Sequence, residues 1–177
     1  FLLSIPIFVG GFILAKNLIP MLFGAEYIGG VPVFSILIFT VLIVFPSTIV
    51  ANALFAYNQQ KQFIWFVAIG AIGNALLNCW LIPRYGIEGS AIATIISQLL
   101  ANIFVWVKMK KTNDFKVFKS LWRALMAVII MGGVVLGLSL VGTHTLLIVL
   151  FGAVVYGVML VLLKEPFLFE IKDILNK

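Results

Sequence analysis

Polar side chains recur at intervals of one helical turn inside strongly apolar stretches of the chain. Asn74 and Asn78 are four residues apart, and a second run of four polar residues has the same spacing: Ser90, Thr94, Gln98 and Asn102. Residues at i and i+4 lie on the same face of a helix. Their amide and hydroxyl groups can donate and accept hydrogen bonds but cannot transfer protons near neutral pH. Such a stripe either bonds to a neighbouring helix or lines a water-filled path, and the sequence leaves both readings open.

Two further polar residues lie in apolar surroundings. Lys16 is the one basic residue within an apolar stretch, where a charge usually faces a cavity or a partner. It could pair with a substrate phosphate, or its long side chain could reach the outer surface. Asn52 lies one turn after Thr48 and close to Pro46, which is expected to kink its helix. The expected set of substrate-binding or cavity-lining residues is therefore Lys16, Asn52, Asn74, Asn78, Thr94, Gln98 and Asn102.

Enzymatic chemistry has no support in the sequence. The loops between the apolar stretches on the side poor in Lys and Arg contain four titratable groups apart from tyrosines: Glu26, Arg84, Glu88 and His144. There are no paired carboxylates, metal-ligand spacings or nucleophile motifs. We expect a protein that is not an enzyme, with no cofactor and no bound metal.

The elements that position these polar residues are expected to be transmembrane helices. With 63% hydrophobic and 10% charged residues and a mean hydropathy of +1.22, the chain lies outside the range of soluble domains. A helix needs roughly 20 apolar residues to cross a bilayer. Six stretches qualify, at residues 1–22, 31–54, 63–82, 89–107, 124–141 and 146–163. The expected fold is an all-α membrane protein with six transmembrane helices.

The basic residues predict the orientation of these helices. Ten of the twelve Lys and Arg residues fall in three alternate gaps: one at Lys61, six within residues 108–123 and three within residues 164–177. The loops on the opposite side contain a single Lys or Arg residue, Arg84. Positive-inside bias therefore places the rich side, including the C-terminus, in the cytoplasm. The net charge of +6 reflects this distribution, so no nucleic-acid partner is expected.

The sequence also suggests subdivisions. Residues 1–107 form a four-helix region, 108–123 a basic cytoplasmic loop, 124–163 two additional transmembrane helices and 164–177 a cytoplasmic tail. Gly133 and Gly137 have the small-xxx-small spacing that permits close helix packing. Because the chain begins at Phe1 in an apolar stretch, we expect a C-terminal piece whose N-terminal part would be a partner in any shared site.

Three motifs in sequence order carry a family resemblance. They are PMLFGAEY at residues 20–27, NALLN at 74–78 and IPRYGIEGSAIAT at 82–94. Together they resemble the C-terminal region of Wzx-type flippases, which export O-antigen and capsule repeat units and belong to the multidrug/oligosaccharidyl-lipid/polysaccharide exporter superfamily. The resemblance covers residues 1–107, whereas residues 124–163 match in hydropathy alone.

The resemblance implies a fold and a function. It implies part of the C-terminal lobe of a MATE-like two-lobe transporter, in a bacterial cytoplasmic membrane. The expected substrate is an undecaprenyl-pyrophosphate-linked oligosaccharide, moved across the membrane by alternating access among membrane lipids. The alternatives are a multidrug or cation antiporter of the same superfamily, or a membrane scaffold that does not transport. The sugar, the coupling ion, the oligomeric state and the role of Lys16 stay open.

Overall fold

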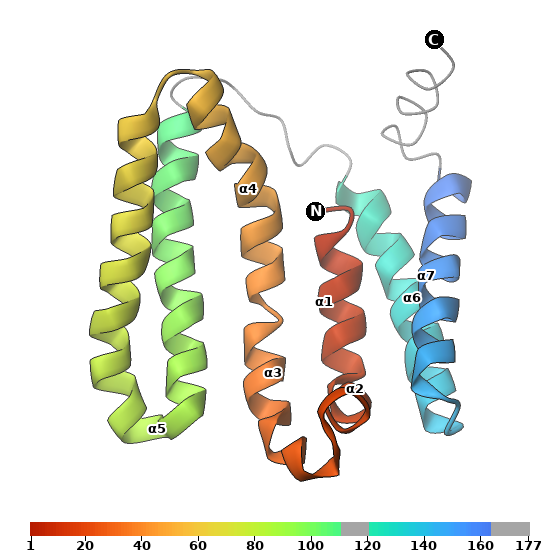
Figure 1. The fold of residues 1–177 in the computed structure, drawn as a ribbon. Coiled ribbons are helices and arrows are strands. Elements are labelled where there is room, and N and C mark those ends of the chain that lie inside the picture. The colour runs from red at the N-terminus through yellow and green to blue at the C-terminus, as the bar shows by residue number, and fades with distance from the viewer. Residues whose placement is uncertain (111–120, 164–177) are drawn as a thin grey trace. The chain divides into compact units, whose positions relative to one another are not determined.

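The structure is a computed structural model that describes residues 1–110 and 121–163. These residues form helices and no strand (Figure 1), so the prediction of an all-α fold is confirmed. The expected tail at 164–177 and most of the expected basic loop at 108–123 lie outside the described residues. The chain divides into two compact units, one made of residues 1–28 and 116–177 and the other of residues 29–115.

The first unit joins the start of the chain to its last two helices. Helix α1 (Ser4–Ile13) packs against α6 (Leu121–Leu140) and α7 (Thr145–Leu162). The hydroxyl of the buried Tyr156 on α7 donates to the backbone oxygen of Leu2 at 2.6 Å. Because an unsatisfied polar group in lipid is costly, this bond fixes the start of α1 against α7.

Close packing in this unit uses different glycines from those expected. A Cβ added to Gly132 would lie 3.4 Å from Val9, and one added to Gly152 would lie 2.9 Å from Val135. Gly133 and Gly137 are exposed, and a Cβ on either would have no atom within 4 Å. The Gly133–Gly137 spacing therefore makes no close contact with the described residues, and its role in helix association stays a prediction. The face of α6 that packs against α1 contains Gly132, the residue just before the expected motif.

The first apolar stretch is not one straight helix, which corrects the expected span at 1–22. It breaks at Leu14, and α1 and α2 (Ala15–Phe23) meet at 82°. The Leu14 carbonyl accepts bonds from the amides of both Asn17 and Leu18, so α2 begins at once. Leu14 and Ala15 are buried at the bend, and α2 contacts α1 and α7. Tertiary packing stabilises the bend, and hydropathy does not reveal it because both halves are apolar.

The second apolar stretch is also bent. A 3₁₀ segment, η1 (Ala25–Gly30), leads into α3 (Val31–Leu37), which precedes α4 (Thr40–Ala56) across a 44° bend. Backbone hydrogen bonds between residues three positions apart mark the break, such as the bond from the Leu42 N–H to the Phe39 carbonyl at 3.1 Å. The bend lies ahead of Pro46, through which α4 continues. This break was not expected, whereas the kink expected at Pro46 stays a prediction.

Helix α5 (Gln60–Lys110) is a hairpin of two arms. Its 51 residues would extend about 76 Å if straight, more than twice the thickness of a bilayer core. Gly86 breaks it with φ 57° and ψ −138°, a conformation that only glycine adopts readily. The two arms then run side by side (Figure 1). This break falls in the gap between the stretches expected at 63–82 and 89–107.

The second unit has its apolar cluster near the open end of this hairpin. Val50 and Leu54 of α4 pack with Val105 and Met109 of the second arm. Nearby, the Trp106 indole N–H donates to the buried Ser47 hydroxyl at 3.4 Å. The hydrogen bond and the cluster together attach α4 to the second arm of α5.

Among the described residues, three helices, α5, α6 and α7, are long and apolar enough to cross a membrane. Counting each bent pair as one span raises this number to five. The chain is therefore part of a multi-pass membrane protein.

The close approach at the α5 turn leads to a stability prediction. A Cβ at Gly89 would meet the backbone carbonyl of Leu81, which cannot move without disturbing the hairpin. We expect Gly89→Ala to lower the unfolding free energy of the full-length protein by roughly 1–3 kcal/mol. Denaturant unfolding in detergent measures the change. Gly133→Ala is the matched control, and equal stabilities of the two variants would contradict this account.

Candidate functional site

The α5 hairpin brings the two expected polar stripes into contact. The Asn74 side-chain amide on the first arm donates to the hydroxyl oxygens of Thr94 and Ser97 on the second arm, at 3.3 Å each. Ser97 is buried, whereas Asn74 and Thr94 are partly exposed. At least part of each stripe is therefore used to join the two arms.

The hydroxyl groups in this cluster also bond within their own helix. Thr94 donates to the carbonyl of Ser90 and Ser97 donates to the carbonyl of Thr94, both at 3.0 Å. Each hydroxyl has one donor proton and two acceptor lone pairs. Since the protons are used in these bonds, both oxygens are left as acceptors for Asn74.

Asn78 extends the cluster by one helical turn. Its amide donates to the Asn74 side-chain oxygen at 2.8 Å, so the two asparagines form a chain of hydrogen bonds along the first arm. The Asn78 Oδ1 atom is buried and accepts no hydrogen bond from the described residues. It is therefore a buried acceptor that this arrangement of the two arms leaves without a partner among the described residues.

Gln98 and Asn102 form a second polar pair on the second arm. The Asn102 side-chain amide donates to the backbone carbonyl of Gln98 at 2.7 Å and to the Gln98 side-chain oxygen, Oε1, at 3.4 Å. The side chain of Asn102 is buried, and its Oδ1 atom also lacks a partner among the described residues. Within the described residues no hydrogen bond joins this pair to Asn74, so the expected stripe divides into two groups.

Ser97 was absent from the expected set. It lies three residues after Thr94, and this spacing also places residues on one helical face. The signal was present in the sequence. Only the position of Asn74 on the facing arm shows that Ser97 is the residue it contacts.

The side chains of the other two expected residues make no hydrogen bond to the described residues. Asn52 is exposed on α4. Lys16 is exposed on the first turn of α2, just after the bend, and belongs to the other compact unit. The hydrogen bonds thus link Asn74, Asn78 and Thr94 in one group and Gln98 and Asn102 in another, and the role of all seven residues stays a prediction.

The cluster can bind but has no group for acid–base chemistry. Asn74, Asn78, Thr94 and Ser97 are neutral side chains with several oriented acceptors and donors. Within residues 1–110 and 121–163, no group of three or more His, Cys, Asp or Glu side chains could hold a metal ion. A polar, uncharged surface of this kind suits hydroxyl- and amide-rich ligands.

Comparison with known proteins identifies the family. The family of the lipid II flippase MurJ matches residues 1–157, which includes every helix of both units up to the middle of α7. The chain belongs to the MurJ lipid II flippase family. The flippase character of the sequence resemblance is thereby confirmed, whereas the finer Wzx-type assignment stays a prediction. The match also extends through α6, beyond the region that the motifs covered.

Two curated relatives have similar sequences. An uncharacterised membrane protein of Methanocaldococcus jannaschii is 27% identical over 166 residues, covering 90% of this chain and 32% of the relative. A probable low-salt glycan biosynthesis flippase of Haloferax volcanii, Agl15, is 28% identical over 93% of this chain and 36% of its own length. The chain thus spans about a third of these relatives. No solved structure gives a significant match.

The contacts across the hairpin predict an energetic coupling. In a double-mutant cycle, Asn74→Ala and Ser97→Ala should show a coupling free energy of about 0.6 kcal/mol, and at most about 1.7 kcal/mol. Denaturant unfolding of the full-length protein in detergent measures it. The control pair is Asn74→Ala with Thr48→Ala, because the Thr48 hydroxyl bonds only to Val44 of its own helix. Additive effects in both pairs would show that the hairpin bonds contribute no stability.

Proposed function

We propose that the protein containing this chain is a flippase for a lipid-linked glycan, and that these residues form part of its C-terminal half. The single observation that carries the proposal is the MurJ family match over residues 1–157. The similarity to a probable glycan biosynthesis flippase gives it further support. The finer proposal from the sequence motifs is an undecaprenyl-pyrophosphate-linked oligosaccharide of the O-antigen or capsule type.

The polar cluster of the α5 hairpin is a candidate contact for the glycan. Sugars present many hydroxyl groups, and Asn78 Oδ1 is a buried acceptor without a partner among the described residues. Gln98 and Asn102 form a second candidate group, and Asn52 is an exposed amide on α4. Neutral hydrogen-bonding groups would let the glycan bind and leave again, as transport requires.

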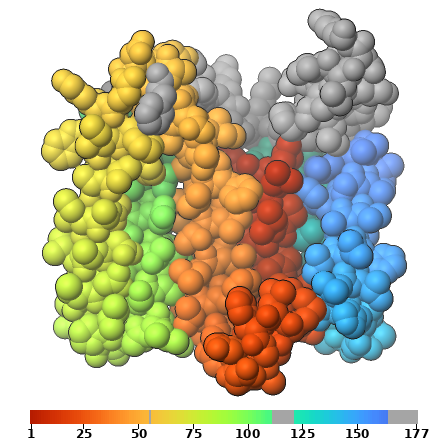
Figure 2. Space-filling model, in the orientation of Figure 1, coloured from red at the N-terminus to blue at the C-terminus, as the bar shows by residue number. Residues whose placement is uncertain are grey.

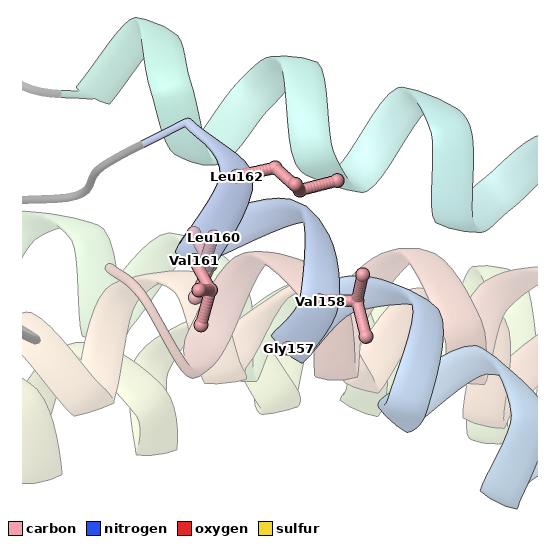
Figure 3. A pocket seen from close by; sticks show the side chains of 5 residues that line it. All are labelled: Gly157, Val158, Leu160, Val161 and Leu162. Carbon is pink, nitrogen blue, oxygen red and sulfur yellow. The ribbon is translucent and has the colours of Figure 1, made fainter.

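Helix α7 provides an apolar surface for the lipid part of such a substrate. A hollow of about 490 Å³ lies along its C-terminal turns (Figure 3), lined by Gly157, Val158, Leu160, Val161 and Leu162. A polyprenyl chain already lies in the hydrocarbon of the bilayer, so contact with these side chains would be stabilised by van der Waals packing rather than by removal from water. We propose that this hollow accommodates part of the polyprenyl chain.

The proposed topology has six spans in a bacterial cytoplasmic membrane. Each bent pair counts as one span and each arm of α5 as another, with α6 and α7 completing the set. The distribution of Lys and Arg supports a cytoplasmic C-terminus. Within the described residues, the acidic side chains are Glu26 in η1 and Glu88 in the α5 turn, both outside the apolar stretches. An antiporter would more typically place an acid within a span to bind its coupling ion, so the flippase is favoured.

Deletion of the full-length gene tests this function. We expect undecaprenyl-linked glycan to accumulate on the cytoplasmic leaflet, because its route to the outer leaflet is lost. The measurement compares labelling of the glycan in intact and in permeabilised cells, with complementation by the intact gene as control. Hypersensitivity to drugs without accumulation would support the antiporter, and neither phenotype would support a scaffold.

Substitution of Asn78 tests the role of the hairpin cluster. Asn78→Leu keeps the branched side-chain shape but removes the unpartnered acceptor together with the bond to Asn74, so export should fall roughly two- to tenfold. The rate of glycan export is compared at equal amounts of membrane-inserted protein. Cys79→Ser is the control, because Cys79 is the neighbouring residue and is exposed. Unchanged export in Asn78→Leu would assign this asparagine to packing alone.

A further inference from the structure

Helix α2 lies crosswise at one end of the first unit. It turns away from α1 by 82°, and Figure 1 shows it nearly end-on, at the end where α6 joins α7. Its inner face is held by the buried side chains of Ala15 and Ile19, and it contacts both α1 and α7. A helix in this orientation cannot continue the path of α1 across a membrane.

The same end of the unit is the one that the basic residues assign to the outside. Both loops there, between residues 22 and 31 and between 141 and 146, contain no Lys or Arg. Positive-inside bias therefore places this end of the unit, and α2 with it, at the outer face of the membrane.

Large apolar side chains on this segment have no cover within the described chain. Leu22, Phe23, Tyr27 and Ile28 are each more than half exposed, and Met21 is also exposed. The rings of Phe23 and Tyr27 lie 6.3 Å apart, so the end of α2 and the start of η1 form one surface. Figure 2 shows this segment protruding beyond the end of α1. Apolar side chains on a helix that lies across the end of a membrane bundle suit burial at the boundary between headgroups and acyl chains.

We infer that α2 and the first turn of η1 form an interfacial anchor in the outer leaflet. The exposed side chains of Met21, Leu22, Phe23, Tyr27 and Ile28 insert between the first methylene groups of the lipids. Tyr27 is of the aromatic type that is enriched at this depth. Lys16 is exposed, makes no ion pair with the described residues and has a stem long enough to reach a lipid phosphate. The inference assigns Lys16 to the membrane surface rather than to a central cavity.

This anchor is independent of the transported substrate. It would hold the outer end of α1 at a fixed depth whether the protein moves a glycan, a drug or nothing. Failure of the export experiments therefore leaves it standing, and its own failure leaves the flippase proposal intact.

Spin-label depth measurement tests the anchor in the full-length protein reconstituted in phospholipid vesicles. Because Cys79 is exposed, labels are placed in a Cys79→Ser background. Leu22→Cys and Phe23→Cys are expected to collide with oxygen more than with a water-soluble nickel complex, at a depth of about 5–10 Å below the phosphates. Ile129→Cys, on an exposed position near the middle of α6, should lie deeper. Ile19→Cys, at a buried position, should meet neither reagent.

Three results would overturn the anchor. Exclusion of both reagents at Leu22 and Phe23 would mean that another part of the protein, or a second copy, covers the segment. Preferential collision with nickel would place it in water, and a depth equal to that of Ile129 would place it within the span. If a cysteine variant fails to fold, Phe23→Trp with quenching by lipids brominated near the headgroup provides the same depth. Lack of quenching in that variant would likewise overturn the inference.

The role of Lys16 is tested separately, by the dependence of the protein's Tm on the lipid headgroup. Anionic phosphatidylglycerol should raise the Tm of the full-length protein relative to phosphatidylcholine, and Lys16→Gln should lose part of this shift. Lys16→Arg should keep it, because arginine also pairs with phosphate. An identical lipid-dependent shift in Lys16→Gln would remove Lys16 from the anchor.

Discussion

The fold depends on the cost of leaving polar groups unsatisfied in lipid. Each unpaired backbone or side-chain group in a hydrocarbon environment costs several kcal/mol. The α5 hairpin meets this constraint by pairing Asn74 with hydroxyls on the opposite arm, while these hydroxyls bond to their own helix. A polar stripe that would destabilise an isolated helix thereby attaches two helices to each other. The remaining unpaired acceptors, on Asn78 and Asn102, then stand out as candidates for function.

The two units use different chemistry for the same purpose. In the second unit, amides and hydroxyls join the two arms of α5, and the Trp106–Ser47 bond attaches α4. In the first unit, contact is mainly between apolar side chains and small residues, with Gly132 beside Val9 and Gly152 beside Val135. The apolar hollow on α7 belongs to the first unit and the polar cluster to the second. The proposed contacts for the lipid and for the glycan therefore arise from different helices.

The sequence predicted helices wherever the apolar stretches were long enough, because hydropathy reports the solvent that surrounds a segment. It predicted the gap that contains Gly86 for the same reason. It did not predict the bend at Leu14, since no proline marks that break and both sides of it are apolar. The spacing of Asn74, Asn78 and Thr94 identified the polar stripes. Periodicity could not show which member of one stripe meets which member of the other, and Ser97 was missed because this depends on the register between two arms.

The first unit also has a consequence for the order in which the protein is built. Tyr156 on α7 bonds to the backbone of Leu2, so residues from opposite ends of the chain complete the same packing layer. During synthesis, α1 enters the membrane before α6 and α7 exist, whereas all the partners of the α5 hairpin are made within a shorter interval. Contacts of large sequence separation form late. Until α6 and α7 have been made, the face of α1 that contains Val9 and Ile13 has only lipid or other helices to cover it.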